Sequence, residues 1–347
     1  MQNNIFFCNF KRFIRSFIII CFNFAQIIKY VMNKEPFLQN FPNSFKLISL
    51  IVIVIICVFL LNLLGILIAI PIWGSDIIKS MTGGIRLDIK DNISFYKFLQ
   101  IFNHLGMFLI PSIFFAYLVK GNIGRYLKIN HRPKIFTLTT GILLIIVCLP
   151  LINWLVTMNE MMTFPESFSY IEEWMRKSEE SAMLFTNEFL NVNNVGGLMI
   201  NLLMIAVIPA IGEEFMFRGV LQKLFKDWLG NAHIAIILSS FLFSAMHLQF
   251  FGFIPRFVLG ILLGYLFYFS RNLWIPIIAH FFNNGFAVII YYLNNNKITN
   301  TDIDKLGSVR NDYLLIIGSF IFSIVLMMSI YKREKIKKKR IIKKEDF

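Results

Sequence analysis

Apolar runs about as long as a membrane-crossing helix recur along the whole chain. A helix of about 20 predominantly apolar residues crosses the hydrocarbon core of a bilayer. Only 16% of the residues are charged, whereas about a quarter of the residues of a typical soluble domain are charged. The predicted fold class is therefore all-α, a polytopic membrane helix bundle of about eight transmembrane helices. The predicted spans are residues 47–73, 97–119, 135–157, 197–225, 233–251, 253–270, 273–293 and 313–331.

The positive charge of the chain, formally +14, gathers in short connections and in a tail at residues 332–340. Basic loops of membrane proteins stay in the cytoplasm, so this placement predicts that both termini are cytoplasmic. The tail directly follows the last span, and we expect it to contact anionic lipids. We expect no nucleic-acid partner, because no basic surface interleaved with aromatic residues accompanies the charge. The basic connections are residues 120–134, 223–232 and 271–272.

Two segments outside the spans need a separate interpretation. Residues 1–46 form an N-terminal cytoplasmic or interfacial extension, in which the apolar run at 17–28 is too short to span comfortably. We expect residues 1–31 to be a start-site artefact, with Met32 as the initiator, and an interfacial anchor is the alternative. The longest polar stretch, residues 158–196, is acidic and has helical spacing, which predicts amphipathic helices on the outer face. These helices would serve as a solvated connector or as a substrate lid.

The fourth predicted span contains three charged residues, Glu213, Glu214 and Arg218. Each would cost roughly 2.5–3.5 kcal/mol at mid-bilayer if left unpaired. Glu214 and Arg218 have i,i+4 spacing with the acid first, which favours an ion pair. A purely structural pair explains these two residues as well as a chemical role does. Glu213 is rotated about 100° away and has no partner on its own helix, so the structural explanation fits it less well. Pro209, one turn earlier, is expected to kink the helix.

Two further predicted spans contain histidines with an i,i+4 neighbour. His247 follows Phe243, whose ring can fix the imidazole, and His280 precedes Asn284 on one helical face. A lone membrane histidine usually hydrogen-bonds to a neighbouring helix, and we assign that role to His104. For His247 and His280 this explanation is weaker, because polar groups recur on three neighbouring spans. Each group needs partners in lipid, and the nearest available partners are one another.

The candidate catalytic residues are therefore Glu213, His247, His280 and Asn284. Peptide hydrolysis needs a general base for water and hydrogen-bond donors for the developing oxyanion. A carboxylate shielded from water is a better base near neutral pH, and a histidine beside it can share the proton. A second histidine and an asparagine amide can donate to the oxyanion. Neither serine nor cysteine occupies these positions, so activated water fits better than covalent catalysis.

Taken together, these motifs resemble those of the CPBP family, which includes CAAX proteases, bacteriocin-processing enzymes and Abi-type immunity proteins. Each motif alone is weak, but the three occur in order and on separate spans. The motifs are Glu213-Glu214-x-x-x-Arg218, Phe243-x-x-x-His247 and His280-x-x-x-Asn284. By this resemblance, residues 196–293 form a CPBP-type catalytic core. Residues 47–195 then supply N-terminal membrane helices with the outer amphipathic segment, and residues 294–347 supply the last membrane helix and the basic tail.

The resemblance implies an intramembrane endopeptidase of the CAAX prenyl protease type. In that family pattern Glu213 and His247 activate water, and His280 and Asn284 form the oxyanion hole. Glu214, Arg218 and Phe243 support the site. We expect no cofactor, because the zinc-binding His-Glu-x-x-His spacing is absent. Zinc held by Glu213, His247 and His280 is the alternative, since two histidines and a glutamate form a known ligand set.

The expected substrate is a membrane-tethered peptide or protein, and the expected location is a bacterial inner membrane. One rival interpretation is a non-catalytic membrane immunity or scaffold protein of the same family, which keeps the polar cluster for folding or partner binding. A proton-coupled transporter is disfavoured, because the polar groups gather at one place and no broken-helix repeat is evident.

Overall fold

The computed structural model describes residues 35–74, 91–300, 306–307 and 312–345, and side chains up to residue 336. All regular structure in these residues is helical. The expected extension at 1–31 lies outside the described residues. The α-helices are α2 (Asn43–Trp73), α4 (Ile93–His104), α5 (Ile110–Lys120), α6 (Ile123–Leu127), α7 (Ile135–Glu160), α8 (Ser169–Leu190), α9 (Val195–Asn201), α10 (Ile208–Glu214), α11 (Gln222–Leu229), α12 (Ala232–Ala245), α13 (Phe253–Ser270), α14 (Trp274–Asn295) and α15 (Tyr313–Glu345).

Seven helices in the described residues are long and apolar enough to cross a membrane. They are Asn43–Trp73, Ile93–Lys120, Ile135–Glu160, Val195–Leu229, Phe250–Ser270, Trp274–Asn295 and Tyr313–Ile336. These spans confirm the predicted polytopic helical bundle. The fifth predicted span, 233–251, is shorter than expected: α12 ends at Ala245. Its 14 residues rise only about 21 Å, less than the hydrocarbon thickness.

Three stretches of π-helix interrupt the described spans, at Leu105–Leu109, Leu202–Val207 and Phe215–Leu221. The first two are each followed, after one intervening residue, by a proline: Pro111 and Pro209. Proline lacks an N–H and its ring collides with the preceding turn, and a widened turn relieves both problems. The disturbance expected at Pro209 therefore takes the form of a π-helical turn. The helix continues through it from Val195 to Leu229.

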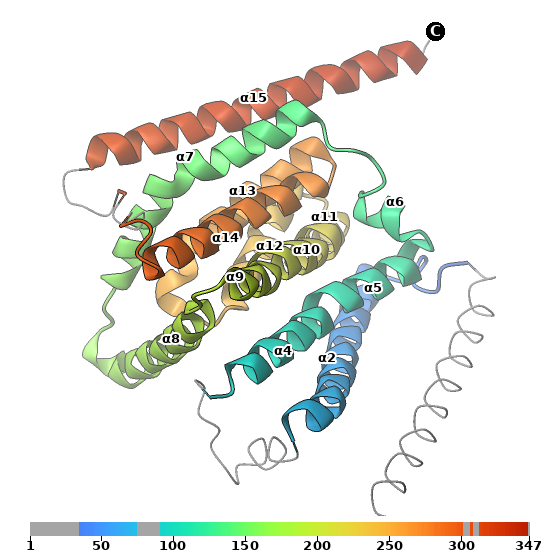
Figure 1. Cartoon of the computed structure of the whole chain (residues 1–347). Coiled ribbons are helices and arrows are strands. Elements are labelled where there is room, and N and C mark those ends of the chain that lie inside the picture. The colour runs from blue at the N-terminus through green and yellow to red at the C-terminus, as the bar shows by residue number, and fades with distance from the viewer. Residues whose placement is uncertain (1–34, 75–90, 301–305, 308–311, 346–347) are drawn as a thin grey trace, which may run out of the picture.

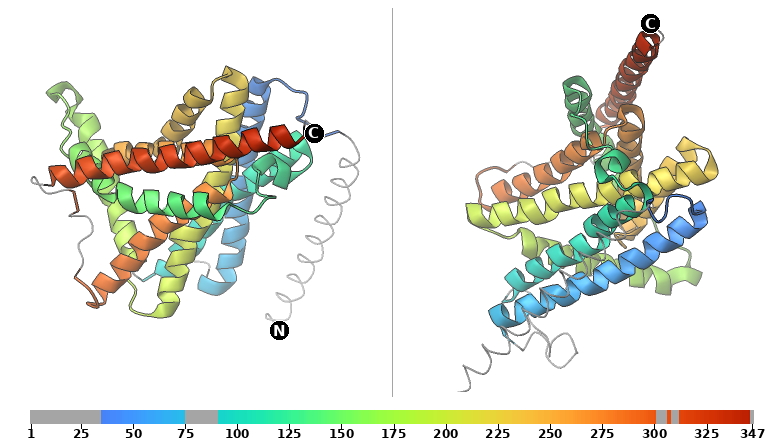
Figure 2. Two further views of the ribbon diagram at one scale, coloured as in Figure 1. Left: turned by 90° about the horizontal axis from the view of Figure 1, so that it is seen from above. Right: turned by 90° about the vertical axis from the view of Figure 1, so that its right-hand side faces the viewer.

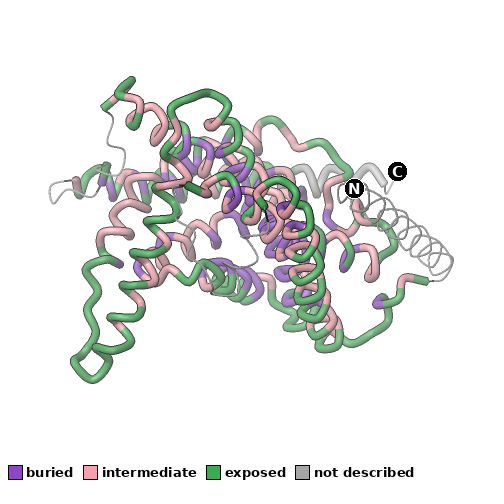
Figure 3. The backbone as a smooth tube through the Cα atoms, turned by 60° about the horizontal axis from the view of Figure 1, so that its bottom comes forward, coloured by how far each residue is buried: buried purple, intermediate pink, exposed green. Residues whose placement is uncertain are grey.

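The long helix Val195–Leu229 lies between two groups of helices (Figure 1). On one side, α2 packs against the continuous helix formed by α4 and α5. On the other side, α14 and α13 pack against α7, and α15 runs along α7, as a second view also shows (Figure 2). Buried positions concentrate toward the middle of the bundle (Figure 3). Apolar side chains of α2 and α15, such as Ile55 and Phe322, are exposed, as expected of a surface that faces lipid.

Glycines bring α13 close to α12. A Cβ at Gly260 would lie 3.0 Å from the Cβ of Ser240, and one at Gly264 would lie 2.8 Å from Cγ2 of Ile236. Small residues four apart are a common means of close helix packing in membranes. The close approach also exposes the carbonyl oxygens of Gly260 and Gly264, which accept hydrogen bonds from Arg218 and Gln222.

The basic connections meet at one end of the bundle. The sequence predicts that they lie on one side of the membrane, and this arrangement agrees with that prediction. The Leu273 N–H donates to the Lys128 carbonyl over 3.2 Å, and the Asn272 amide donates to the His131 carbonyl over 2.8 Å. Lys134, before α7, forms an ion pair with Glu334 of α15. These contacts place residues 128–134, 271–273 and the start of the tail together. That this end is cytoplasmic remains a prediction from the charge.

Candidate active site

The pair Glu214–Arg218 is the most deeply buried ion pair described. Arg218 Nη1 lies 2.6 Å from Glu214 Oε1, and both side chains are fully buried. Arg218 Nη2 donates to the Gly260 carbonyl over 2.9 Å, and the guanidinium carbon lies 4.6 Å from the centre of the Phe243 ring. The i,i+4 pair expected from the sequence is present. It joins the helix Val195–Leu229 to both α12 and α13.

His280 continues this network onto α14. Its Nδ1 lies 2.9 Å from Glu214 Oε1, so the carboxylate oxygen that binds Arg218 also accepts from His280. The Nδ1 atom must then carry hydrogen. Asn284 Nδ2 lies 3.3 Å from His280 Nε2 and donates to the Ile205 carbonyl over 3.1 Å. Asn283 in turn donates to Asn284 Oδ1 over 3.0 Å. The two expected oxyanion donors, His280 and Asn284, thus lie together and fix each other's orientation.

Glu213, the carboxylate without a partner on its own helix, lies between two histidines. Its Oε2 is 3.9 Å from His280 Nε2, and its Oε1 is 3.5 Å from His104 Nε2. His104 ends α4 and comes close because α10 carries a glycine: a Cβ at Gly212 would lie 3.2 Å from the Cβ of Phe108. Glu213 is only 6% exposed, and its remaining exposure is toward a cavity.

His247 lies in the turn after α12, and its ring is held by Phe243 in two ways. The His247 Nδ1 lies 2.9 Å from the Phe243 carbonyl, and the two ring centres are 5.3 Å apart. Because a carbonyl can only accept, Nδ1 carries the hydrogen and Nε2 keeps its lone pair. The Phe243 ring also packs 5.8 Å from the His280 ring. Phe243 therefore lies between both histidines and Arg218, as a common apolar support.

The cavity that Glu213 faces has a volume of about 850 Å³. His104, His247, His280 and Asn284 line it together with Glu213. All four predicted catalytic residues therefore border one space. Its walls are otherwise rich in aromatic and aliphatic side chains.

The helix α8 covers part of this cavity. Phe185 and Phe189 of α8 line it, and the Phe185 ring lies 5.9 Å from that of Tyr96 on α4. Nearer the start of α8, the Trp174 ring packs 5.2 Å from the ring of Phe250, the first residue of the short helical turn before α13. No side chain of α8 is buried, and its polar face carries ion pairs between residues four apart, such as Glu173–Lys177. A helix with a polar face is present in the predicted stretch, and it lies at the cavity. That it lies on the outer face remains a prediction.

Arg256, in the first turn of α13, is the one arginine or lysine among the described residues that line this cavity. Its guanidinium bonds to the Gln249 carbonyl and side-chain oxygen, which are both neutral groups. A cation at a helix N-terminus is electrostatically unfavourable, because that end of the helix dipole is positive. The guanidinium charge of Arg256 also interacts electrostatically with the carboxylates of Glu179 and Glu213.

The alternative zinc ligands are not brought together as a metal site in the described part of the chain, where no three side chains of the types His, Cys, Asp and Glu are placed to hold one ion. The bonds from His280 Nδ1 to Glu214 and from His247 Nδ1 to a backbone carbonyl orient the two rings, and they are compatible with either a proton or a metal at Nε2. We derive no catalytic step through zinc.

Sequence reasoning missed His104, Asn283 and Arg256. The sequence predicts a hydrogen bond between helices for His104, but its Nε2 has no hydrogen bond in the described residues and instead lies 3.5 Å from Glu213 Oε1, within ion-pair range. A signal was available, because His104 lies in a predicted span just as His247 and His280 do. Arg256 carried the same signal as a charged residue in an apolar segment. Only the packing shows that both face the cavity of Glu213.

Comparison with known proteins gives three matches and one negative result. Residues 195–286 match a family model described as type II CAAX prenyl endopeptidase Rce1-like. The membrane-embedded CAAX protease MroQ of Staphylococcus aureus (strain USA300) is 35% identical over 96 residues, which are 26% of this chain and 38% of that protein. The uncharacterized protein YpbD of Bacillus subtilis (strain 168) is 31% identical over 85 residues, 23% of this chain and 40% of that protein. The match therefore spans about two fifths of each of these relatives. No solved structure matches the chain.

Proposed function

The chain is a member of the CAAX protease (CPBP) family through residues 195–286, and from that premise we propose that it is an intramembrane endopeptidase. It would cleave membrane-associated peptides or proteins. The observation that carries the proposal is the position of Glu213. This carboxylate borders a cavity of about 850 Å³ that His247, His280 and Asn284 also line.

The proposed reaction uses Glu213 as general base. Glu213 takes a proton from water while the water oxygen bonds to the carbonyl carbon of the scissile peptide bond, and the carbonyl electron pair moves onto oxygen. The C–N bond then breaks, and the proton passes to the departing nitrogen. His247 supports the first step because its Nε2 keeps a free lone pair. One water and one peptide bond give one carboxylic acid and one amine.

Stabilisation of the oxyanion is assigned to His280 and Asn284, under one chemical condition. His280 Nδ1 bonds to Glu214, so Nε2 can donate only when the ring holds both protons. Asn284 would turn one amide hydrogen from its present partners toward the substrate. Glu214 and Arg218 hold the ring of His280 in place.

A second function rests on a different reading of the same contacts. The side chains of Glu214, His280, Asn284 and Asn283 form hydrogen bonds to one another without any substrate. A polar cluster of this kind also suits a non-catalytic immunity or scaffold protein, in which it would fix the packing of the helices. Both functions require the same fold, and only catalysis requires the Glu213 carboxylate.

The deciding experiment compares membrane peptides from cells that carry either the wild-type chain or Glu213→Gln. The substitution keeps the size of the side chain and removes the base. The proteolytic function predicts that precursors accumulate and their cleaved products disappear, with normal insertion of the variant. The matched control is Glu180→Gln on the exposed face of α8, which should behave as wild type. Unchanged peptides in the Glu213→Gln strain, together with normal complementation of a deletion strain, would favour the scaffold function.

A further inference from the structure

A second, smaller cavity lies at the basic end of the bundle, with no residue in common with the cavity of Glu213. Its volume is about 190 Å³, and Lys128, Lys223, Lys226 and Arg271 line it. We call these four residues with Tyr268 the basic pocket. Among the described residues that line it, none is acidic. Like charges gathered around one small space are costly unless something negative enters it.

Two of the four cations occupy backbone positions that usually belong to glycine. Lys128 closes α6 with φ 58°, and Arg271 closes α13 with φ 53°, both in the left-handed region. A residue with a Cβ is strained there, and glycine is the common choice at such helix ends. The Leu273 N–H bonds to the Lys128 carbonyl, which locks the two helix ends together. Two cations therefore lie side by side at positions where glycine would have less backbone strain.

Helix dipoles explain only part of this arrangement. Helix C-termini attract cations, and α6, α11 and α13 all end near the pocket. Attraction to separate helix ends does not require the cations to converge on one space. Within the described residues, Lys128, Lys226 and Arg271 form no ion pair, and Asp227 is the one acid whose charge acts on Lys128. Burial, followed by the charges of Arg271, Lys226 and Lys120, lowers the pKa of Lys128.

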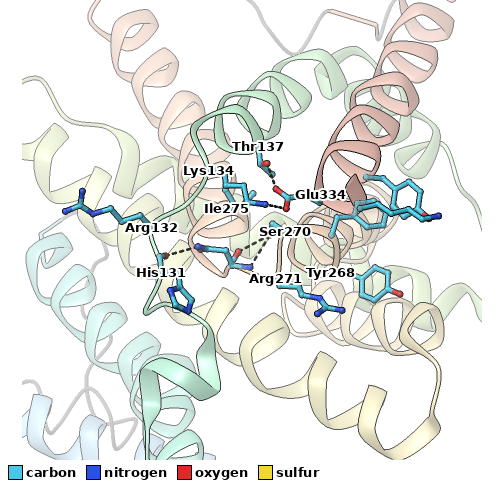
Figure 4. Close-up of a pocket in the computed structure, with 13 residues that line it drawn as sticks. His131, Arg132, Lys134, Thr137, Tyr268, Ser270, Arg271, Ile275 and Glu334 are labelled. Atoms are coloured by element: carbon cyan, nitrogen blue, oxygen red, sulfur yellow. Dashed lines mark hydrogen bonds and ion pairs between the residues drawn. The ribbon is translucent and has the colours of Figure 1, made fainter. Parts of the chain in front are cut away.

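A larger cavity adjoins the basic pocket and shares Tyr268 and Arg271 with it. It has a volume of about 700 Å³ and lies between the loop that carries Arg132 and Lys134 and the turn that carries Ser270 (Figure 4). Ile275 and Tyr331 add apolar surface to its wall. Lys134 is neutralised by Glu334, but Arg132 and Arg271 are not in a described ion pair. A phosphate in the basic pocket would therefore have room beside it for the rest of a larger molecule.

We propose that the basic pocket binds the phosphate group of an anionic ligand, through Lys128, Lys226 and Arg271. Lys223 would add long-range attraction only, because its ammonium group is engaged by the Tyr126 carbonyl and the Tyr126 ring. The pocket lies where membrane-spanning helices end, which is the depth of lipid headgroups. An anionic phospholipid and a free phosphate share this chemistry. The proposal goes beyond the protease function and does not depend on it.

The test uses the full-length protein, purified in phosphatidylcholine-containing micelles. Phosphatidylglycerol is added as the lipid probe and inorganic phosphate as the soluble probe, and bound lipid is measured by native mass spectrometry. The pocket variant is Lys226→Gln with Arg271→Gln. The matched control is Lys120→Gln with Arg125→Gln, which removes the same charge from exposed positions of the basic connection at the same end of the bundle. Thermal unfolding in phosphatidylcholine alone checks that each variant is folded, and the single change Lys226→Gln serves if the double variant is not.

We expect wild-type protein to retain phosphatidylglycerol, with affinity falling about fivefold for each pocket cation removed. The Lys120→Gln with Arg125→Gln control should stay within about twofold of wild type, on the same scale. If inorganic phosphate displaces the lipid at equal concentration, the pocket stands and its ligand is a soluble phosphate. Equal losses in the pocket and control variants would overturn the proposal in favour of general attraction to a basic surface. So would the absence of binding by both probes.

Discussion

His104 Nε2 lies 3.5 Å from Glu213 Oε1, across the closest approach of α4 and α10. The histidine nitrogen has no hydrogen bond in the described residues, so it is held near the carboxylate without being bonded to it. His104 lies outside the segment that matches the CAAX protease family model. The N-terminal helices therefore contribute to the environment of the proposed base.

His104→Gln should lower kcat about tenfold with little change in KM, because the imidazole positions Glu213 rather than binding substrate. The measurement is cleavage of a reconstituted membrane peptide, once a substrate is identified. His233→Gln is the control. His233 lies at the start of α12, at the end of that helix away from His247, and its ring is hydrogen-bonded to the Tyr265 hydroxyl. Wild-type kinetics in His104→Gln would show that this histidine contributes to helix packing and not to the positioning of Glu213.

Arg218→Met should destabilise the protein by about 3–5 kcal/mol, because it leaves Glu214 buried without its cation. The double change Glu214→Gln with Arg218→Met should regain much of that stability, since no buried charge is then left over. It should remain inactive, because His280 loses the carboxylate that orients it. Unfolding monitored by circular dichroism in detergent gives the stabilities. A double variant as unstable as Arg218→Met would show that the pair itself stabilises the fold.

Gly212→Val should separate α10 from the helix that carries His104. The first added carbon alone would lie 3.2 Å from the Phe108 Cβ and 3.5 Å from the Leu109 nitrogen, and such overpacking costs about 1–3 kcal/mol. We expect reduced thermal stability together with a larger loss of cleavage. Gly318→Val on α15 is the matched control, because a Cβ there meets nothing within 4 Å. Similar effects from both substitutions would contradict the role given to Gly212.

Cleavage should survive chelators, and elemental analysis of the purified protein should find no stoichiometric zinc. The reason is geometric, since no three side chains of the types His, Cys, Asp and Glu converge on a single ion in the described residues. Zinc at one equivalent that disappears in His247→Ala would reverse this prediction and restore the metal-bound alternative.

The length of the apolar runs was enough to predict the spans, but it could not mark every helix end. The predicted span 233–251 stops at Ala245 because the chain turns there, with Leu248 in the left-handed region at φ 52°. Hydrophobicity continues through Leu248 and Phe251, so composition gives no sign of the turn. The π-helical turns were equally hidden, apart from the hint that prolines give.

The candidate site was predictable where contacts lie within one helix and less so between helices. The pairs Glu214–Arg218 and Phe243–His247 follow from i,i+4 spacing alone. The contacts of His104 with Glu213 and of His280 with Glu214 depend on which faces meet in three dimensions. Spacing can propose such a meeting but cannot choose the partner. In the structure, the carboxylate nearer to His280 is that of Glu214 rather than that of Glu213.

The π-helical turn at Leu202–Val207 has a consequence for how the chain tolerates insertions and deletions. Such a turn accommodates one residue more than the surrounding helix needs. Deleting one residue there would restore regular winding and leave the residues beyond it on their present faces. Inserting one residue into a regular part of the helix would instead turn everything beyond it by about 100°, so that Glu213 and Glu214 would leave the face they share with α14. A scan of this helix should therefore find that single deletions at residues 202–207 keep insertion and cleavage, whereas single insertions in its regular part keep insertion and lose cleavage. In this helix, the count of residues matters to the chemistry as much as their identity.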